Sequence, residues 1–158
     1  MSNSDGLWDW ALTAYKREGV SEDCLQLQDY FEQNVCLLLW GAWCADTGRL
    51  PDEDTLEAAA DTARAWETTT ITPLRAVRRT LKAPVPDLDT DARLAVREQI
   101  KAVELLAERH LLNQLQDLAP PPSGKVRPVL DGMADAARLW ARIIPRPALK
   151  TLAERLSA

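Results

Sequence analysis

The sequence has few of the residues from which metal centres, disulfide scaffolds and histidine relays are built. It contains one histidine, His110, and three cysteines, Cys24, Cys36 and Cys44, among 158 residues. The cysteine spacing matches neither a CxxC pair nor a zinc-binding pattern, and an odd number leaves one thiol outside any set of disulfides. We therefore expect small, buried, free thiols in a reducing compartment and no metal site.

Long apolar runs are also missing. The longest mainly apolar stretch, residues 35–45, is about half of the roughly 20 residues that a transmembrane helix needs. The first ten residues, MSNSDGLWDW, contain no basic region followed by an apolar run, so no secretory signal is expected. These features predict a cytoplasmic protein without a membrane span.

Alternation of apolar and polar residues, the pattern of strands, is absent, as is any internal repeat. Apolar residues recur instead every three or four positions, which is the spacing of one helical face. Hydrophobic residues make up 46% and charged residues 27% of the chain, typical of a globular protein of about one domain. We predict an all-α bundle of about five helices, with residues 1–118 as its main domain.

The most apolar segment, residues 21–47, is predicted to be one long helix at the centre of this bundle. Ser21 suits the beginning of a helix, and Gly48 suits its end. The second half of the segment is apolar nearly all round, which predicts neighbouring helices on several sides. Within it, Trp40 and Trp43 are interpreted as core residues.

Capping residues and prolines predict the helices that surround this centre. They are expected to begin at Ser4 or Asp5, at Pro51, at Thr72 and at Asp89 or Thr90. The threonine-rich stretch before Pro73 is poor helix material, so a break or a kink is expected there, with Thr72 capping the helix that follows. The last of these helices should end near Leu118.

A proline-rich segment marks the one clear internal boundary. Residues 119–128 include four prolines and are predicted to be a stiff linker. Residues 129–158 are predicted to be a C-terminal helical appendage, with an amphipathic helix that Pro145 ends and a short helix over 148–156. The apolar face of this appendage must cover either the same bundle or another chain, so a homodimer is one interpretation.

A cluster of cations without an intervening acid lies in the helix expected to begin at Thr72. We call it the basic stripe: Arg75, Arg78, Arg79 and Lys82. Arg75 lies in the first turn beside the Thr72 hydroxyl and free backbone donors, a place that attracts anions. Either the stripe binds a phosphate or carboxylate, or its cations pair with the acidic segment around residues 52–61 or simply form a solvated helix face.

Three functions from different classes are consistent with these patterns. The leading hypothesis is a non-enzymatic interaction or regulatory protein whose basic stripe docks an acidic protein partner or a phosphate-bearing ligand, with Trp66 or Trp8 as an aromatic anchor. The first alternative is contact with nucleic-acid phosphates, although a net charge of −5 opposes it. The second alternative is an enzyme with Asp29 or Glu104 as a general base in an inter-helix pocket.

The remaining polar residues do not form a catalytic motif. Asp29 is expected to fix helix packing by facing an arginine or an indole. Glu104 and Glu108 lie one turn apart, as in a di-metal bundle, but the matching Glu and Glu-x-x-His sets on other helices are missing. We therefore predict no catalytic residue, no metal ligand and no cofactor.

Several segments of the chain share a pattern with a known family. They are LWDWAL at 7–12, CLQLQD at 24–29, LLLW at 37–40, PLR at 73–75, LK at 81–82 and VELLAER at 103–109. Together they resemble an uncharacterised proteobacterial family of small all-helical proteins, a domain of unknown function, over residues 5–118. The family pattern often has a glycine before the apolar run and an asparagine before the three leucines, where this chain has Glu32 and Cys36. The resemblance implies an all-α fold but no reaction.

Overall fold

The computed structural model describes residues 6–158, and these residues form helices and loops without a strand. The elements are α1 (Leu7–Tyr15), α2 (Val20–Asp29), α3 (Val35–Asp46), α4 (Glu53–Trp66), the π-helical η2 (Glu67–Ile71), α5 (Thr72–Thr80), α6 (Thr90–Leu118), α7 (Val129–Trp140) and α8 (Arg146–Leu156). The predicted all-α class is confirmed. The caps predicted at Ser4 or Asp5 lie outside the described residues.

The segment predicted as one central helix, residues 21–47, is two helices, α2 and α3, separated by residues 30–34. Glu32 in this turn has a φ of 52°, in the left-handed region that favours glycine. Asn34 then caps α3 by accepting a hydrogen bond from the backbone N–H of Leu37 at 2.9 Å. The prediction was wrong because apolar periodicity continues across the turn and neither glycine nor proline marks it.

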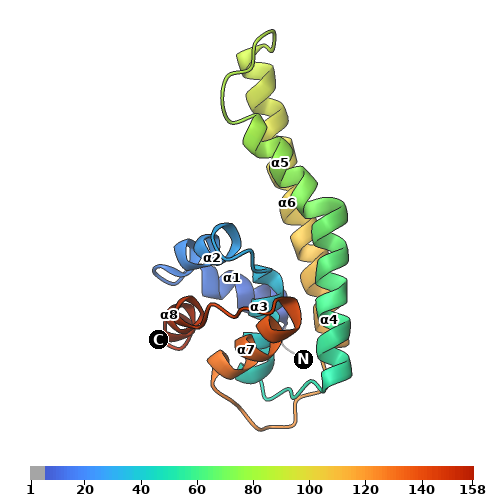
Figure 1. Cartoon of the computed structure of the whole chain (residues 1–158), viewed down its shortest axis with the longest axis vertical. Coiled ribbons are helices and arrows are strands. Elements are labelled where there is room, and N and C mark those ends of the chain that lie inside the picture. The colour runs from blue at the N-terminus through green and yellow to red at the C-terminus, as the bar shows by residue number, and fades with distance from the viewer. Residues whose placement is uncertain (1–5) are drawn as a thin grey trace.

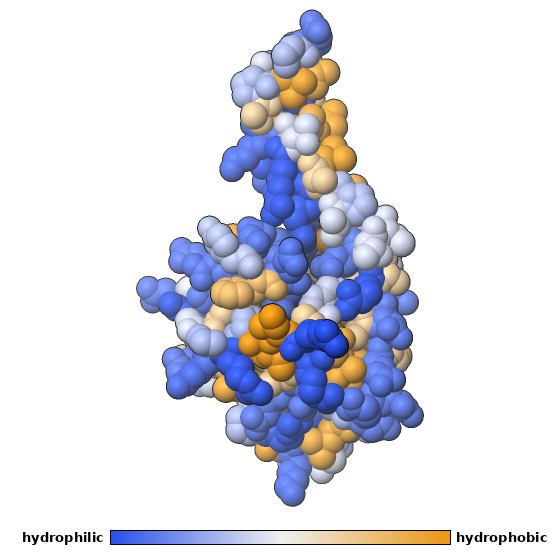
Figure 2. All heavy atoms as spheres, in the orientation of Figure 1, coloured by the Kyte–Doolittle hydropathy of each residue, from blue (hydrophilic) through white to orange (hydrophobic). Residues whose placement is uncertain are grey.

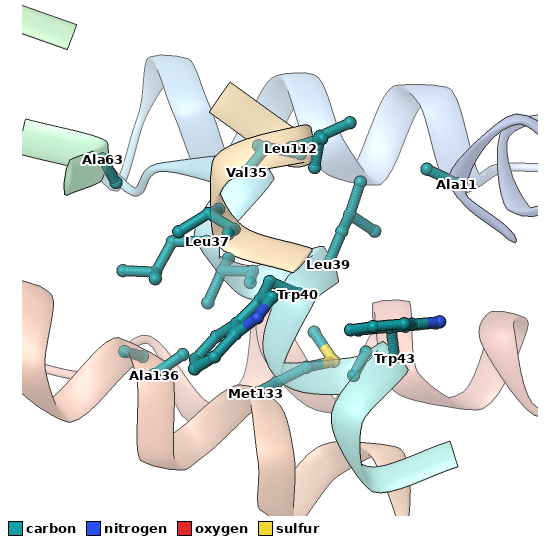
Figure 3. Packing of buried hydrophobic residues seen from close by; sticks show 14 of the residues in the cluster. Ala11, Val35, Leu37, Leu39, Trp40, Trp43, Ala63, Leu112, Met133 and Ala136 are labelled. Carbon is teal, nitrogen blue, oxygen red and sulfur yellow. The ribbon is translucent and has the colours of Figure 1, made fainter. Parts of the chain in front are cut away.

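The centre of the fold is α3, of whose twelve residues ten are buried. Trp40 and Trp43 are 0% and 1% exposed, which confirms them as core residues, and Figure 3 shows Met133 and Ala136 of α7 packed nearby. Gly41 of α3 and Gly132 of α7 meet so closely that a Cβ atom on either would clash with the backbone of the other helix. The segment expected to be an appendage therefore contributes to the main core.

The rod formed by α4, η2 and α5 is continuous, so of the break or kink predicted before Pro73 the break does not occur, whereas the rod changes direction between α4 and α5 (Figure 1). A π-helical turn absorbs an extra residue and interrupts the α-helical hydrogen-bond ladder, which gives Pro73 a place where its missing N–H is tolerated. Thr72 consequently lies inside the rod in helical conformation and does not cap it. This turn positions the side chains described below.

An arm made of α5 and α6 extends from the body of the molecule (Figure 1). As predicted, α6 begins after Asp89, which caps it by accepting a hydrogen bond from the backbone N–H of Ala92, and ends at Leu118. The lower half of α6 packs on the body through buried residues that include Leu111, Leu112 and Leu115. In contrast, α5 buries none of its residues, so the upper arm is exposed on several sides.

The proline-rich segment, residues 119–128, is an extended loop, as predicted. Its backbone is attached to the end of α3, because Ser123 N–H donates to the Gly48 carbonyl at 2.7 Å and Arg127 N–H donates to the Ala45 carbonyl at 3.0 Å. This attachment directs α7 along α3. The amphipathic helix that follows ends at Trp140 rather than at Pro145, which leaves residues 141–145 as a loop at the surface.

Candidate functional site

A polar cleft of about 790 Å³ lies where the arm meets the body. Its walls come from the end of α2 and the turn after it, from η2 and α5, and from the end of α7 and the loop that follows. Figure 2 shows strongly hydrophilic residues gathered at this junction. The charged residues that line the cleft are Asp29, Glu32, Glu67, Arg64, Arg75, Arg79 and Arg142. Four arginines thus face three acids, which gives the lining an excess of one positive charge.

An exposed ion pair forms the rim of the polar cleft on the side of α2. Arg79 Nη2 lies 2.8 Å from Asp29 Oδ1, and the two side chains are 56% and 38% exposed. This contact agrees with the expectation that Asp29 faces an arginine, although the pair lies at the surface and is not buried. Exposed ion pairs contribute about 0–1 kcal/mol. Arg79 can therefore exchange its partner for a ligand at little cost.

A stacked arginine–tryptophan pair forms the opposite wall. The Arg64 guanidinium lies 4.1 Å from the Trp140 ring centroid, and Arg64 Nη2 donates to the Trp140 carbonyl at 2.8 Å. Trp140 Nε1 in turn donates to the Glu32 carbonyl at 2.9 Å. These contacts join α4, α7 and the turn between α2 and α3 into one wall. Arg64 is therefore held in place and has less freedom to move toward a ligand.

Arg75 lines the polar cleft, and it shares one buried carboxylate, Glu104, with Arg78, which lies outside the cleft. Glu104 is 9% exposed in its side chain; Arg78 Nε donates a hydrogen bond to its Oε2, and Arg75 Nε lies 3.9 Å from its Oε1. Arg75 is 13% exposed, and its Nε is buried without a hydrogen-bond partner. Because both cations face Glu104, that acid is a structural counter-ion and is poorly placed to act as a general base.

Two further carboxylates surround Arg75. Burial raises the pKa of Glu67 and of Glu108, and the positive charge of Arg75 opposes that rise in both. Glu67 also accepts a hydrogen bond from Asn34 Nδ2 at 3.5 Å. Since Glu67 belongs to η2, the π-helical turn places a carboxyl group of raised pKa in the lining of the cleft.

Three of the four cations in the basic stripe are thus paired inside the molecule. Their partners are Glu104 and Asp29, and none of them pairs with the acids of residues 52–61. Within that acidic segment, Glu53 accepts two hydrogen bonds from Arg138, at 2.9 and 3.0 Å. Lys82 is exposed at the end of α5 and has no ion pair within residues 6–158. The stripe is therefore divided into inward-facing and accessible members. Thr72 is exposed and lines the cleft.

The two tryptophans proposed as anchors do not line the polar cleft. Trp66 is partly buried, donates a hydrogen bond to Gln114 and stacks on His110 with ring centroids 6.4 Å apart. Trp8 lies under the Arg109 guanidinium, which is 5.0 Å from its ring centroid. Both rings are engaged within the molecule.

Sequence reasoning missed three exposed residues that line the cleft. Phe31 is 45% exposed and Ile143 is 83% exposed, while Arg142 is exposed and has no ion pair within residues 6–158. Phe31 was expected to lie inside the long helix over residues 21–47, and Arg142 and Ile143 were assigned to the helix before Pro145. The only local signal was Pro145, which disfavours the helical conformation at Ile144 but does not predict that α7 ends at Trp140.

A second pocket of about 380 Å³, with mainly apolar walls, lies between α6 and helices α1 and α2. It contains Trp8, Leu12 and Leu105, and it shares Arg75 with the polar cleft. The three cysteines are free thiols, and burial raises the pKa of Cys24 and of Cys44 to about 12. Such thiols are poor nucleophiles at neutral pH.

The comparisons with known proteins identify a family but no activity. Residues 6–115 match the model of a family described as a protein of unknown function (DUF2390), so the chain belongs to this family and the expected resemblance is confirmed. No curated protein and no solved structure matches the chain. Within residues 6–158, no group of three His, Cys, Asp or Glu side chains could hold a metal ion, and no helix could cross a membrane.

Proposed function

We propose that this DUF2390 protein is a non-enzymatic interaction protein that docks an acidic segment of a protein partner in the polar cleft. The observation that carries the proposal is an open cleft in which four arginines outnumber three acids, bordered by the exposed apolar side chains of Phe31 and Ile143. Charge guides the partner to the cleft, and apolar anchors hold it there.

Two arginines carry the contact. Arg142 is exposed and has no ion pair within residues 6–158, so it binds a partner carboxylate without losing a contact. Arg79 exchanges the exposed Asp29 for the partner's carboxylate, which it accepts through two parallel N–H donors. The Thr72 hydroxyl, which lines the same cleft, adds a neutral hydrogen bond. Of the basic stripe, Arg79 therefore has the main role.

The inward-facing arginines are held by Glu104 and do not bind the partner. Arg75 and Arg78 are both occupied by Glu104, and a ligand anion would have to displace a buried carboxylate to reach them. The same pairing weakens the nucleic-acid alternative, since it removes two of the four cations that would meet phosphates. Single-stranded DNA is the phosphate-bearing probe in the binding test below.

The proposed setting is the cytoplasm. All three cysteines are free, and free thiols are typical of a reducing compartment. An acidic partner in the same compartment can reach the cleft directly.

A labelled peptide tests the docking proposal. The probe is fluorescein-labelled Asp-Phe-Glu-Leu-Asp-Glu, and the matched neutral peptide is Asn-Phe-Gln-Leu-Asn-Gln; binding is measured by fluorescence anisotropy. The Arg79→Glu/Arg142→Glu variant should weaken binding of the acidic peptide by about tenfold or more, since charge-assisted hydrogen bonds contribute about 1.5–3 kcal/mol each. The neutral peptide should bind weakly to both proteins.

The matched control is Lys82→Glu/Arg146→Glu, which changes the net charge equally but substitutes exposed cations outside the cleft. Its affinity should stay near that of the parent. Equal losses in the two variants, or no binding of the acidic peptide by the parent, would contradict docking in the cleft. Salt-sensitive binding of single-stranded DNA that is lost with Lys82→Glu would support the nucleic-acid alternative instead.

A second candidate function is an enzyme with a carboxylate general base, and one observation favours it. Glu67 combines a raised pKa with a place in the cleft and in a π-helical turn, a feature often found at functional sites. Turnover of a generic ester or phosphate ester that Glu67→Gln abolishes would support it. If the Glu67→Gln variant keeps its turnover, or if the parent turns over neither substrate, the result counts against an enzyme of this kind.

A further inference from the structure

An uncharged stripe follows one face of α6 along the arm. Its members recur at alternating four- and three-residue intervals, the spacing of a coiled-coil seam. We call it the α6 seam: Ala92, Val96, Gln99, Val103, Leu106 and His110. All six residues are exposed, and Val96, Val103 and Leu106 leave 52%, 45% and 53% of their surface accessible.

The α6 seam points away from the body. Leu105, Glu108 and Leu112, which line the pocket against α1 and α2, lie on the opposite side of α6 at 100° per residue. On α5, Val77 is 46% exposed and projects away from the side that carries Arg79 toward the polar cleft. The seam and Val77 therefore form a mainly apolar surface, which the described part of the chain contacts only at its lower end, where the Trp66 ring stacks on His110.

Charged side chains avoid this surface. Seven lie between residues 92 and 110, and none occupies a seam position: Arg93, Arg97, Glu98, Lys101, Glu104, Glu108 and Arg109. Arg93 donates a hydrogen bond to the Leu81 carbonyl at 2.6 Å, and Arg97 donates one to the Arg78 carbonyl at 3.3 Å. Both guanidinium groups therefore face the rest of the arm and not the seam. A helix face that is exposed only to water usually carries charged residues, so a face without them indicates contact with another surface.

The α6 seam is also symmetric about residue 101. In an antiparallel pair of helices centred there, Val96 faces Leu106, Gln99 faces Val103, and Ala92 faces His110 of the other copy. Ala95 and Ala102 lie beside the seam, and their small side chains allow close approach. A surface that matches itself under a two-fold rotation is what a symmetric dimer requires.

The ends of the seam fit the same arrangement. Leu88, just before α6, is 49% exposed, and the antiparallel register places it beside Gln114, the residue that Trp66 contacts. From residue 90 to 114, α6 is about 37 Å long; with α5 alongside, the surface is about 20 Å wide. That gives on the order of 700 Å² per copy, close to the roughly 800 Å² of a standard interface.

We infer that the α6 seam docks a second copy of this chain, antiparallel, so that the α5–α6 arms of two copies pack into a four-helix bundle. The contact covers the arm on the side away from the polar cleft. It leaves both clefts open, and it supports α5, which buries no residue in the single chain. The inference is independent of what the cleft binds.

Sedimentation velocity of the full-length chain over a concentration series tests the inference. The parent should approach twice the 17.6 kDa of one chain as its concentration rises. Val103→Glu places an unpaired carboxylate opposite Gln99 of the other copy on each side of the two-fold axis and should raise the dimer dissociation constant by about a hundredfold. Far-UV circular dichroism checks that the variant keeps its helices; if it does not, Val96→Gln, a milder change at another seam position, takes its place.

The matched control is Leu94→Glu, which introduces the same charge on an exposed leucine of α6 outside the seam. It should leave the dimer unchanged. A parent that stays monomeric, a dimer that survives the seam substitution, or equal dissociation in control and seam variants would each overturn the inference.

A spin label on Ala92→Cys tests the orientation. In the antiparallel dimer the two labelled positions lie at opposite ends of the seam, about 27 Å apart along the helix axis. A parallel dimer brings them within about 15 Å. A long distance by pulsed electron resonance supports the antiparallel pairing, and a short one contradicts it.

Discussion

At the residue scale, the organising contact is the buried Glu104 between Arg75 and Arg78. The Glu104 side chain is 9% exposed, and its carboxylate neutralises two arginines of the basic stripe. Sequence reasoning could find all three residues but could not pair them, because they lie 26 or more positions apart and the acids of residues 52–61 offered nearer partners. The pairing depends on how α5 and α6 pack, which composition does not encode.

Removing this carboxylate tests its structural role. Glu104→Ala leaves two partly buried cations without a counter-ion and should lower the free energy of unfolding by about 3 kcal/mol in urea. The control is Glu98→Ala, whose pair with Lys101 at 3.5 Å is exposed and should contribute less than about 0.5 kcal/mol. Similar small losses for both substitutions would show that Glu104 is not a buried counter-ion.

The raised pKa of Glu108 predicts a dependence on pH. A carboxyl whose pKa is higher in the folded protein than its usual 4.5 binds more protons when folded, so its contribution to stability falls as pH rises through the folded pKa. Glu108→Gln removes the cost of burying that charge. It should therefore raise the urea midpoint at neutral pH, and the gain should vanish below the unfolded pKa. A gain that persists in acid, or a loss at neutral pH, would contradict burial as the cause.

At the element scale, sequence patterns predicted most of the helices but not all of the turns that connect them. The cap at Asp89 and the linker at residues 119–128 were predicted because local chemistry determines them. The turn at residues 30–34 and the π-helical turn at 67–71 were not predicted, since each departs from what its residues favour locally. Tertiary packing decides both, and both line the polar cleft.

Glu32 offers a test of the first joint. Its φ of 52° is costly for a residue with a Cβ atom, and Glu32→Gly removes that cost while keeping the carbonyl that Trp140 contacts. The substitution should stabilise the protein by about 0.5–1 kcal/mol in thermal or urea unfolding. The companion Asn34→Ala, which removes the cap of α3, should cost about 1 kcal/mol. A destabilising Glu32→Gly would contradict the left-handed turn.

At the scale of the whole molecule, one arm has two different sides. The side toward the body carries the charged residues of the polar cleft, while the side away carries the uncharged α6 seam. A net charge of −5 with a locally positive cleft favours a selective acidic partner over general adhesion to polyanions. The family match ends at residue 115, so α7 and the loop with Arg142 and Ile143 lie beyond it.

The most direct test of docking in the polar cleft is an amide chemical-shift titration of the full-length chain with the acidic peptide. We expect the largest shifts at residues 28–33, 72–79 and 140–143, together with a shift of the Trp140 indole N–H, whose carbonyl partner Glu32 borders the cleft. Shifts confined to the arm around Lys82 or to α8, with the Trp140 indole unmoved, would contradict it.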